Sequence, residues 1–327
     1  MRTTARLTGL AFTVCTIGAL VGLVAACSGG SSIAALDDAG PSGSPDSGST
    51  DSSADASNDP GASGFCTEFH VGGQSDPGIG GTAQSQVIAQ SVADFAGAAA
   101  TQVVELTAAC KKLATALSAP ANQQMAAEAQ ADPSEKMKAW CTVATMAVSS
   151  AKTSAGSIAI TRSTSSCKLS VATKGACQAR CSPSGTCDLA ANPVKCTGGT
   201  LAGGFCEGGK LEGGCAVDAK CDASCDLTVI ATATCPAPTV ATSVTPSGSA
   251  NATTLKSALD VALPTILSLQ THFDEEATVS STAGGVADGL SDLKVSCIPK
   301  VITAADTAIS QIAAGSSTGS SFIDSVH

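Results

Sequence analysis

Cysteine is the residue type whose number and spacing in this chain could support chemistry. Ten of the 16 cysteines lie between Cys167 and Cys235, and the steps from one to the next are 10, 4, 6, 9, 10, 9, 6, 4 and 10 residues. These steps read the same in both directions. Cysteine side chains form disulfides, bind soft metal ions or exchange electrons as dithiols, so this segment contains the main candidate residues.

Two of the steps form C-x3-C pairs, Cys177 with Cys181 and Cys221 with Cys225. Redox dithiols usually have two intervening residues at a helix N-terminus beside a βαβ pattern, and neither feature is present. Zinc sites favour closer cysteine pairs together with histidines, whereas the three histidines of this chain are scattered. The sequence therefore favours structural disulfides, with no cofactor and no metal site. A metal-binding or thiol-redox protein of the cell envelope is the alternative.

The N-terminus predicts export and a lipid anchor. Arg2 and Arg6 precede an uncharged apolar run over residues 7–26, which is the pattern of a signal peptide. The run closes with the sequence L-V-A-A-C, which resembles the bacterial lipobox, and the resemblance implies that Cys27 receives a diacylglyceryl group. An uncleaved membrane helix is the alternative, because 20 apolar residues can span a bilayer. Both interpretations attach the protein to a membrane, and Ser28 fits the outer-membrane sorting of such lipoproteins.

Residues 28–64 predict a tether. The segment is rich in Ser, Gly, Asp, Ala and Pro and contains six Asp but no basic residue. Such a segment buries too little apolar surface to offset the entropy of ordering, so we expect a disordered linker. A flexible coil of this length would span about 30–40 Å between the lipid and the folded part.

The cysteine count predicts a disulfide framework. Without Cys15 in the signal peptide and the lipidated Cys27, 14 cysteines remain, an even number in an exported chain. The mirrored spacing suggests nested pairs whose members lie equally far from Leu201, as in a hairpin folded there. The predicted pairs are Cys167–Cys235, Cys177–Cys225, Cys181–Cys221, Cys187–Cys215 and Cys196–Cys206. Local pairings between neighbouring turns remain open. The partners of the other four stay undetermined: Cys66, Cys110, Cys141 and Cys297.

Residues 166–236 are expected to form a β module. The segments that start at Cys167 and Cys225 resemble each other (C-K-L-S-V and C-D-L-T-V), and their apolar residues alternate with period two. Gly-Gly dipeptides between them indicate turns. This composition predicts small-core β structure rather than helix.

Apolar residues recur at helical spacing before the module, in an arm at residues 65–165. One stripe covers residues 81–119 and includes Cys110. A second helix starts at Asp132-Pro-Ser-Glu135, where Asp132 is the expected N-cap and Glu135 is placed for a capping box. The two long helices are expected to form an antiparallel hairpin.

Helical spacing returns after the module. A Pro/Ser/Thr linker at 237–253 leads to a C-terminal helical arm at 254–314, which is expected to pack on residues 65–165, and then to a flexible tail at 315–327. The predicted fold class is α+β: an Ala-rich helical bundle formed from both flanks of the chain, with an inserted disulfide-rich β module.

Composition and charge argue against several function classes. Aromatic residues make up 2% of the chain and Tyr is absent, whereas sugar clefts and base-stacking surfaces both depend on aromatic platforms. The net charge of −10 becomes −12 when Arg2 and Arg6 are removed with the signal peptide, and this charge repels nucleic-acid phosphates. We therefore expect no nucleic-acid partner, and no small-molecule substrate is indicated.

Two further motifs are explained without a catalytic role. Gly315-x-Ser317-x-Gly319 matches the nucleophile-elbow pattern, but no strand precedes it and the chain ends eight residues later, so a flexible terminus explains it better. The carboxylate run that ends at Glu276 is expected to be a solvated helix face.

The lipobox, the acidic linker and the C-x3-C pairs together resemble uncharacterised Cys-rich lipoproteins of myxobacteria, and this resemblance implies no known activity. The expected protein is a non-enzymatic, lipid-anchored component of the cell envelope, at the outer membrane. Its disulfide-stabilised module would act as a structural or protein-interaction element, with the membrane and other envelope proteins as partners. A hydrolase is a weaker alternative.

Overall fold

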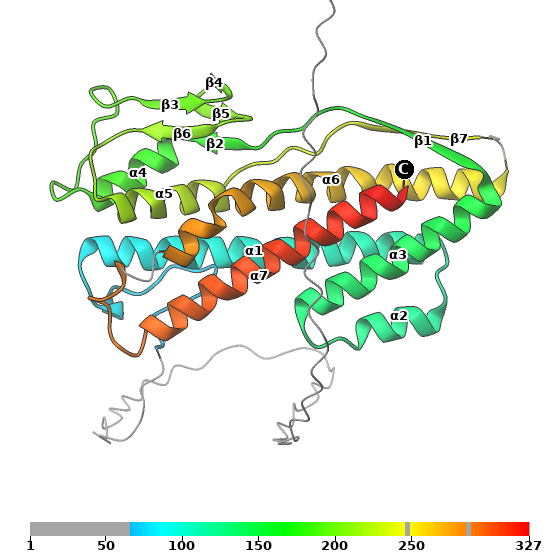
Figure 1. Cartoon of the computed structure of the whole chain (residues 1–327), viewed down its shortest axis with the longest axis horizontal. Coiled ribbons are helices and arrows are strands. Elements are labelled where there is room, and N and C mark those ends of the chain that lie inside the picture. Colours follow the sequence, from blue (N-terminus) through cyan, green and yellow to red (C-terminus); the bar gives the residue numbers. More distant parts are fainter. Residues whose placement is uncertain (1–65, 246–248, 286–288, 327) are drawn as a thin grey trace, which may run out of the picture. The chain divides into compact units, whose positions relative to one another are not determined.

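The computed structural model describes residues 66–245, 249–285 and 289–326. The chain divides into two compact units, Met1–Asn58 and Asp59–His327, and every described residue belongs to the second. The predicted lipid-attachment residue Cys27 and the linker at 28–64 lie outside the described residues. Within the second unit, long helices pack beside small antiparallel sheets (Figure 1), and this confirms the predicted α+β class.

Helix α1 (Ala83–Ala116) lies at the centre of the packing. It follows a short 3₁₀ turn (Pro77–Ile79), and Thr82 caps it by accepting a hydrogen bond from the backbone N–H of Ser85. By length and by a mean hydropathy of 1.2, α1 could also span a membrane, but 61% of that apolar window is buried inside the fold. The apolar character of α1 is therefore explained by its place in the core.

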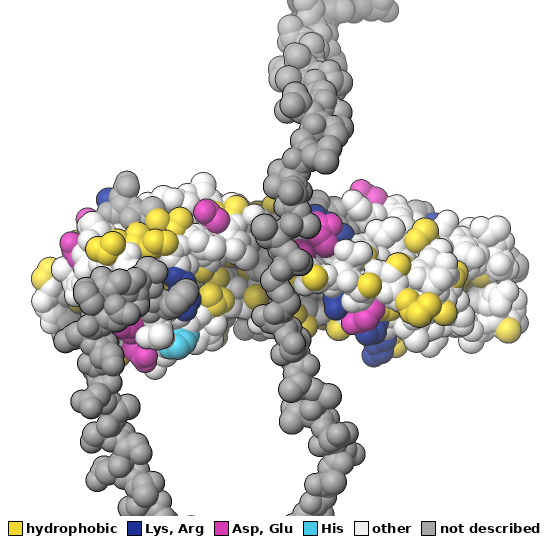
Figure 2. Space-filling view, turned by 90° about the horizontal axis from the view of Figure 1, so that it is seen from below, with side chains coloured by type: hydrophobic (Ala, Val, Ile, Leu, Met, Phe, Trp, Pro, Cys, Tyr) yellow, Lys and Arg dark blue, Asp and Glu magenta, His cyan; other side chains and the backbone are white. Residues whose placement is uncertain are grey.

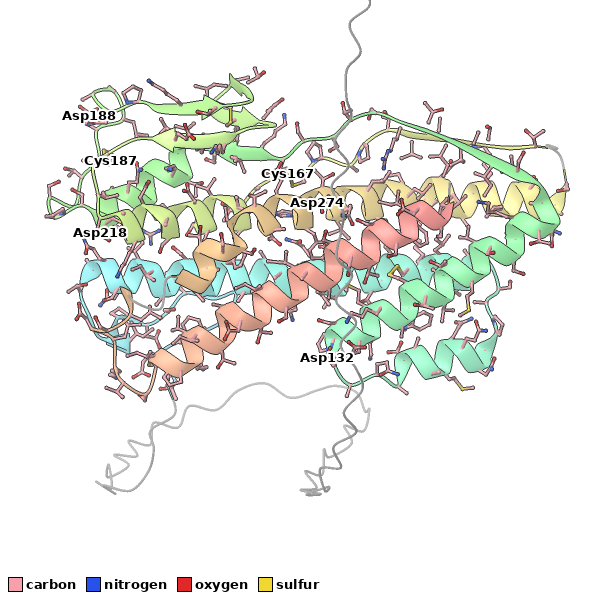
Figure 3. The ribbon with its side chains drawn as sticks, in the orientation of Figure 1. Asp132, Cys167, Cys187, Asp188, Asp218 and Asp274 are labelled. Carbon is pink, nitrogen blue, oxygen red and sulfur yellow. A yellow bond between two sulfur atoms is a disulfide. The ribbon has the colours of Figure 1, made fainter. Side chains whose placement is uncertain are left out.

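Helices α2 (Ala121–Glu128) and α3 (Pro133–Ala155) complete the N-terminal arm. Asp132 caps α3 as predicted, because its Oδ1 accepts a hydrogen bond of 2.9 Å from the N–H of Glu135 (Figure 3). The predicted antiparallel hairpin is wrong. The connection between α1 and α3 is long enough to hold α2, which carries the chain back, so α3 runs in the same direction as α1 (Figure 1).

A two-stranded ribbon joins the two ends of the inserted segment. Strands β1 (Ser157–Arg162) and β7 (Val240–Thr245) pair antiparallel, with Ile160 opposite Thr242. The sequence places β1 in a helical arm and β7 in the linker at 237–253, and both assignments differ from the structure. A short strand of this kind is stabilised by its cross-strand neighbour, which here lies about 80 residues away along the chain, so local periodicity does not reveal it.

The cysteine-rich centre contains two helices, α4 (Val171–Cys181) and α5 (Ala219–Ala231), so the expectation of β structure rather than helix is wrong for these two stretches. Ser170 caps α4 and Asp218 caps α5, each through its side-chain oxygen. The C-x3-C step is the i, i+4 spacing of a helix face. This local signal outweighs the period-two pattern of the apolar residues.

Five short strands make up the rest of the centre. One sheet has the order β2-β5-β4 and the other pairs β3 with β6, all antiparallel. Their bounds are β2 (Lys168–Ser170), β3 (Val194–Thr197), β4 (Thr200–Ala202), β5 (Phe205–Glu207) and β6 (Lys210–Gly213). The small sheets cover one side of the α4–α5 helix pair (Figure 1).

Two long helices form the C-terminal arm: α6 (Ala250–Gly285), with Pro264 inside it, and α7 (Ile298–Val326). Both pack on α1 and on α3. The predicted flexible tail at 315–327 is wrong as far as Val326, because α7 continues to that residue. A Cβ atom at Gly315 would lie 2.4 Å from the ring of Phe273, so the glycine allows α7 to approach α6 closely.

Candidate functional site

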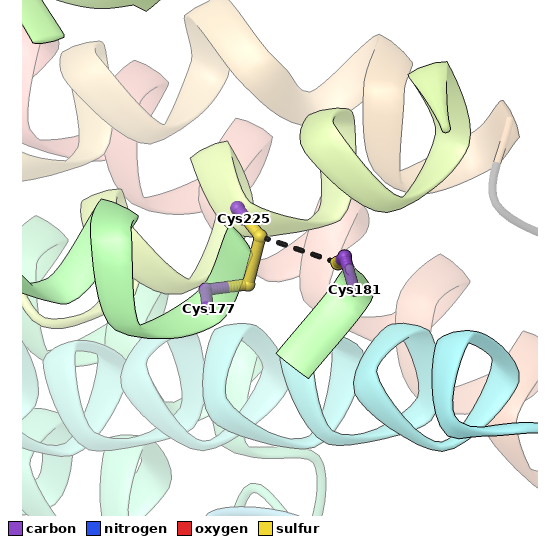
Figure 4. A group of neighbouring side chains, drawn as sticks. All are labelled: Cys177, Cys181 and Cys225. Atoms are coloured by element: carbon purple, nitrogen blue, oxygen red, sulfur yellow. Dashed lines mark hydrogen bonds between the residues drawn. A yellow bond between two sulfur atoms is a disulfide. The ribbon is translucent and has the colours of Figure 1, made fainter. Parts of the chain in front are cut away.

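The α4–α5 helix pair carries the densest group of cysteines. Cys177 and Cys181 lie one turn apart on α4, and Cys221 and Cys225 lie one turn apart on α5. Because the helices are antiparallel, bridges form between Cys177 and Cys225 and between Cys181 and Cys221. The two bridges are adjacent, with 3.7 Å between the Sγ atoms of Cys181 and Cys225 (Figure 4). All four side chains are at most 2% exposed.

Three further bridges close the centre of the chain. Cys167–Cys235 lies beside the antiparallel bridge between Lys168 and Thr234, Cys187–Cys215 joins two loops, and Cys196–Cys206 joins β3 to β5. With the two helix bridges, these are the five pairs that the mirrored spacing predicts.

The physical basis of the nested pattern differs from the predicted one. No single long hairpin is present in the described part of the centre. The strand ladder turns at Gly203 and Gly204, and it places Cys196 opposite Leu211 rather than opposite its bridge partner Cys206. The pairs Cys177–Cys225 and Cys181–Cys221 are nested because α4 and α5 are antiparallel, and Cys167–Cys235 follows from the antiparallel bridge between Lys168 and Thr234. Any antiparallel pair of elements, helical or extended, brings together residues equally far from one centre.

The four cysteines whose partners the sequence leaves undetermined form two bridges. Cys110–Cys141 joins α1 to α3, and Cys66–Cys297 ties the first described residue to the start of α7. All 14 cysteines within the described ranges are therefore paired. Seven disulfides in one chain are typical of proteins that fold in an oxidising compartment.

Three sulfur atoms lie near one another on the helix pair. The Sγ atoms of Cys177, Cys181 and Cys225 all lie within 4.8 Å of one another, but those of Cys177 and Cys225 are bonded at 2.03 Å, much closer than two thiolates around a tetrahedral zinc ion. Only a thiolate binds the metal, and each of these sulfurs is part of a disulfide. In this state the group is a cross-link rather than a ligand set.

A buried lysine holds the sheets against the helix pair. Lys174 on α4 is 1% exposed, and its Nζ lies 2.8 Å from Oδ1 of Asp226 and donates to the carbonyl oxygen of Leu211 on β6. Burial raises the pKa of Asp226, and the hydrogen bond from Lys174 partly offsets that rise. Gln178, one turn along α4, donates to Asp222 at 2.7 Å. Sequence reasoning missed this network, although Lys174 and Gln178 share the face of the cysteines at i, i+3 and i, i+4 spacing.

A second buried polar group lies between α1, α5 and α6. Glu276 is fully buried, and its Oε1 accepts a hydrogen bond of 2.7 Å from Nε2 of Gln102. Nε2 of His272 lies 3.8 Å from the same carboxyl and 3.2 Å from the carbonyl oxygen of Ile230. Burial raises the pKa of Glu276 to about 8 and lowers the pKa of His272. Both side chains are therefore neutral at neutral pH.

The expectation that the carboxylate run forms a solvated face is wrong for Glu276. The apolar stripe of this helix could have predicted the burial of Glu276. This residue follows Phe273 by three residues, on the helix face that also contains Leu263 and Ile266. Of the other two members of the run, Asp274 is exposed (Figure 3) and Glu275 is half-buried. A stripe that ends in a carboxyl predicts a buried acid at that point.

The segment Gly315-x-Ser317-x-Gly319 does not form a nucleophile elbow. Ser317 lies inside the continuous helix α7, and its hydroxyl donates to the carbonyl oxygen of Ala314. A nucleophile elbow needs a sharp turn between a strand and a helix, and α7 has neither at this position.

No protein-family model, no curated protein and no solved structure matches this chain. The structure alone therefore describes this chain, as a helical bundle with an inserted, disulfide-stabilised module.

Proposed function

We propose that this chain is a non-enzymatic, lipid-anchored protein of the cell envelope, in which the disulfide-stabilised module serves as a rigid structural or protein-interaction element. One observation carries the proposal: all 14 cysteines in the described ranges are paired. A protein that binds metal through cysteine, or that reduces its targets with a dithiol, needs free thiols in its resting state.

The anchor in this proposal is a lipid on Cys27. The lipobox-like sequence before that residue and the acidic linker after it support the idea, and Ser28 favours the outer membrane. The linker would let the folded unit stand about 30–40 Å from the lipid surface. Replacing Cys27 with Ser should move the protein from the detergent phase to the aqueous phase of a Triton X-114 extraction, and continued detergent partitioning would argue for an uncleaved helix.

The interaction surface in this proposal is the β4–β5 hairpin. Strand β4 lies at an edge of its sheet, and Leu201 and Phe205 expose 51% and 41% of their surface there. Exposed sheet edges are templates for strand addition by a partner chain. The partner class is another envelope protein that supplies an extended segment.

The test counts free thiols in denatured protein, residues 28–327, purified from an oxidising compartment, with bound metal measured on the same sample. We expect no free thiol and no metal. Two or more free thiols, or stoichiometric zinc, would replace the proposal with the metal-binding or thiol-redox alternative, centred on the C-x3-C pairs.

A further inference from the structure

An apolar groove lies between α1 and α7. The two helices pack against each other, and the segment that follows Cys66 closes one side of a cavity of about 950 Å³. The α7 residues that line it recur at steps of three and four from Pro299 to Gln311, so the groove follows one face of that helix for about 18 Å at 1.5 Å per residue. It is long enough for an extended ligand.

Small side chains leave the groove open. Ala96 and Ala100 lie one turn apart on α1 and face Ala304 on α7. At the mouth, Val71 and Val295 are 49% and 84% exposed to solvent. Water in contact with such apolar surface is released when a hydrophobic ligand covers it. The lining therefore favours an aliphatic occupant.

Lys300 is the one charged side chain that lines the groove, as far as the described residues extend. Its Nζ donates hydrogen bonds of 2.9 Å to the carbonyl oxygens of both Cys66 and Phe69. These two bonds fix the ammonium group and leave its third N–H free. Among the residues that the structure describes, no carboxylate forms an ion pair with Nζ of Lys300, whereas Lys294 pairs with Glu68.

We propose that this groove binds a long-chain fatty acid anion, with the aliphatic chain between α1 and α7 and the carboxylate on Nζ of Lys300. Small-molecule sites are typically concave and apolar, with a few placed polar groups that fix orientation. One fixed cation at an otherwise uncharged groove matches one carboxylate. The lining lacks the aromatic platforms that a nucleobase or sugar would need. On the face shown in Figure 2, Lys and Arg side chains are scattered rather than clustered.

This inference goes beyond the envelope function and does not depend on it. The test uses residues 28–327 with intact disulfides, stripped of lipid on a hydrophobic resin. The probe is cis-parinaric acid, a fluorescent fatty acid, and palmitate is the competitor. We expect saturable one-to-one binding that palmitate displaces. Hexadecanol should displace the probe about tenfold less well, because it lacks the charge that a hydrogen-bonded ion pair recognises.

A charge variant with its matched control, and a groove-filling variant with its substitute, locate the site. Lys300→Gln should weaken palmitate binding about tenfold, whereas Lys195→Gln, which changes an exposed lysine on β3, should leave it unchanged. Ala100→Phe should fill the groove and abolish binding. If Ala100→Phe fails to fold by circular dichroism, Thr307→Phe fills the same groove from α7 at an exposed position.

Several results would overturn the proposal. These are an absence of saturable binding, equal displacement by hexadecanol and palmitate, or unchanged affinity in a folded groove-filling variant. Binding that appears only in a chain beginning at Asp59 would also overturn it, and would assign the groove to the N-terminal segment of the chain itself.

Discussion

Replacing Glu276 with Gln should stabilise the protein at neutral and alkaline pH. The carboxyl is fully buried, with Gln102 as its hydrogen-bond donor and Oε2 without a partner among the described residues. Its pKa rises from 4.5 to about 8 in the folded state. A folded-state pKa above the unfolded value means that the folded state holds the proton more tightly, so stability falls as the pH rises from 4.5 to 8.

The size of the effect follows from the shift. A rise from 4.5 to about 8 corresponds to about 5 kcal/mol at 1.36 kcal/mol per pKa unit, and about 3 kcal/mol of this is already lost at pH 7. Glutamine keeps the shape of the side chain and cannot ionise. The free energy of unfolding of Glu276→Gln should therefore exceed that of the natural protein by an amount that grows between pH 5 and pH 8.5.

The assay is urea unfolding followed by circular dichroism at pH 5, 7 and 8.5, at constant ionic strength and with disulfides intact. His272 also contributes to the pH dependence, because its lowered pKa makes the free energy of unfolding fall as the pH drops below 6.5. Comparing the two proteins at each pH removes this contribution, since both contain His272. Glu275→Gln is the matched control, and its half-buried carboxyl should give a smaller change. A difference between Glu276→Gln and the natural protein that stays constant within about 1 kcal/mol across this range would refute the assignment of a buried neutral carboxyl.

Three further substitutions test the packing, each by the midpoint of thermal unfolding and the free energy of unfolding in urea. Joint replacement of Cys181 and Cys221 by Ser should cost about 2–3 kcal/mol. The flanking bridges Cys177–Cys225 and Cys187–Cys215 stay intact, so only a short loop is opened in the unfolded chain; a loss below 1 kcal/mol would contradict this. Lys174→Met should cost about 2–3 kcal/mol, because it leaves the carboxylate of Asp226 without its partner; adding Asp226→Leu should restore part of the loss. Gly315→Ala should cost about 1–3 kcal/mol despite the better helix propensity of alanine, because its Cβ meets a buried ring; a stabilised variant would show that α6 and α7 lie further apart.

Local patterns in the sequence were sufficient for the long helices and for some of their ends. The stripe through Cys110 gives α1, and Asp132-Pro-Ser-Glu135 gives the start of α3, because capping and helical periodicity act within a few residues. The mirrored cysteine spacing gives the five central bridges without the correct secondary structure, since it depends on antiparallel geometry and not on the type of element.

The tertiary structure decided what depends on residues far apart in the chain. It determined the direction of α3, the pairing of β1 with β7, and the continuation of α7 through Gly315 against α6. It also placed Glu276 at a junction of three helices, where burial keeps its carboxyl neutral, and it formed the groove at Lys300 from two helices and the segment after Cys66. The amino-acid sequence by itself suggested the five central cysteine pairs and determined which faces are apolar, because residue spacing and hydrophobicity can be read without the fold. Burial and enclosure depend on the packing of distant segments, and only the folded chain defines them.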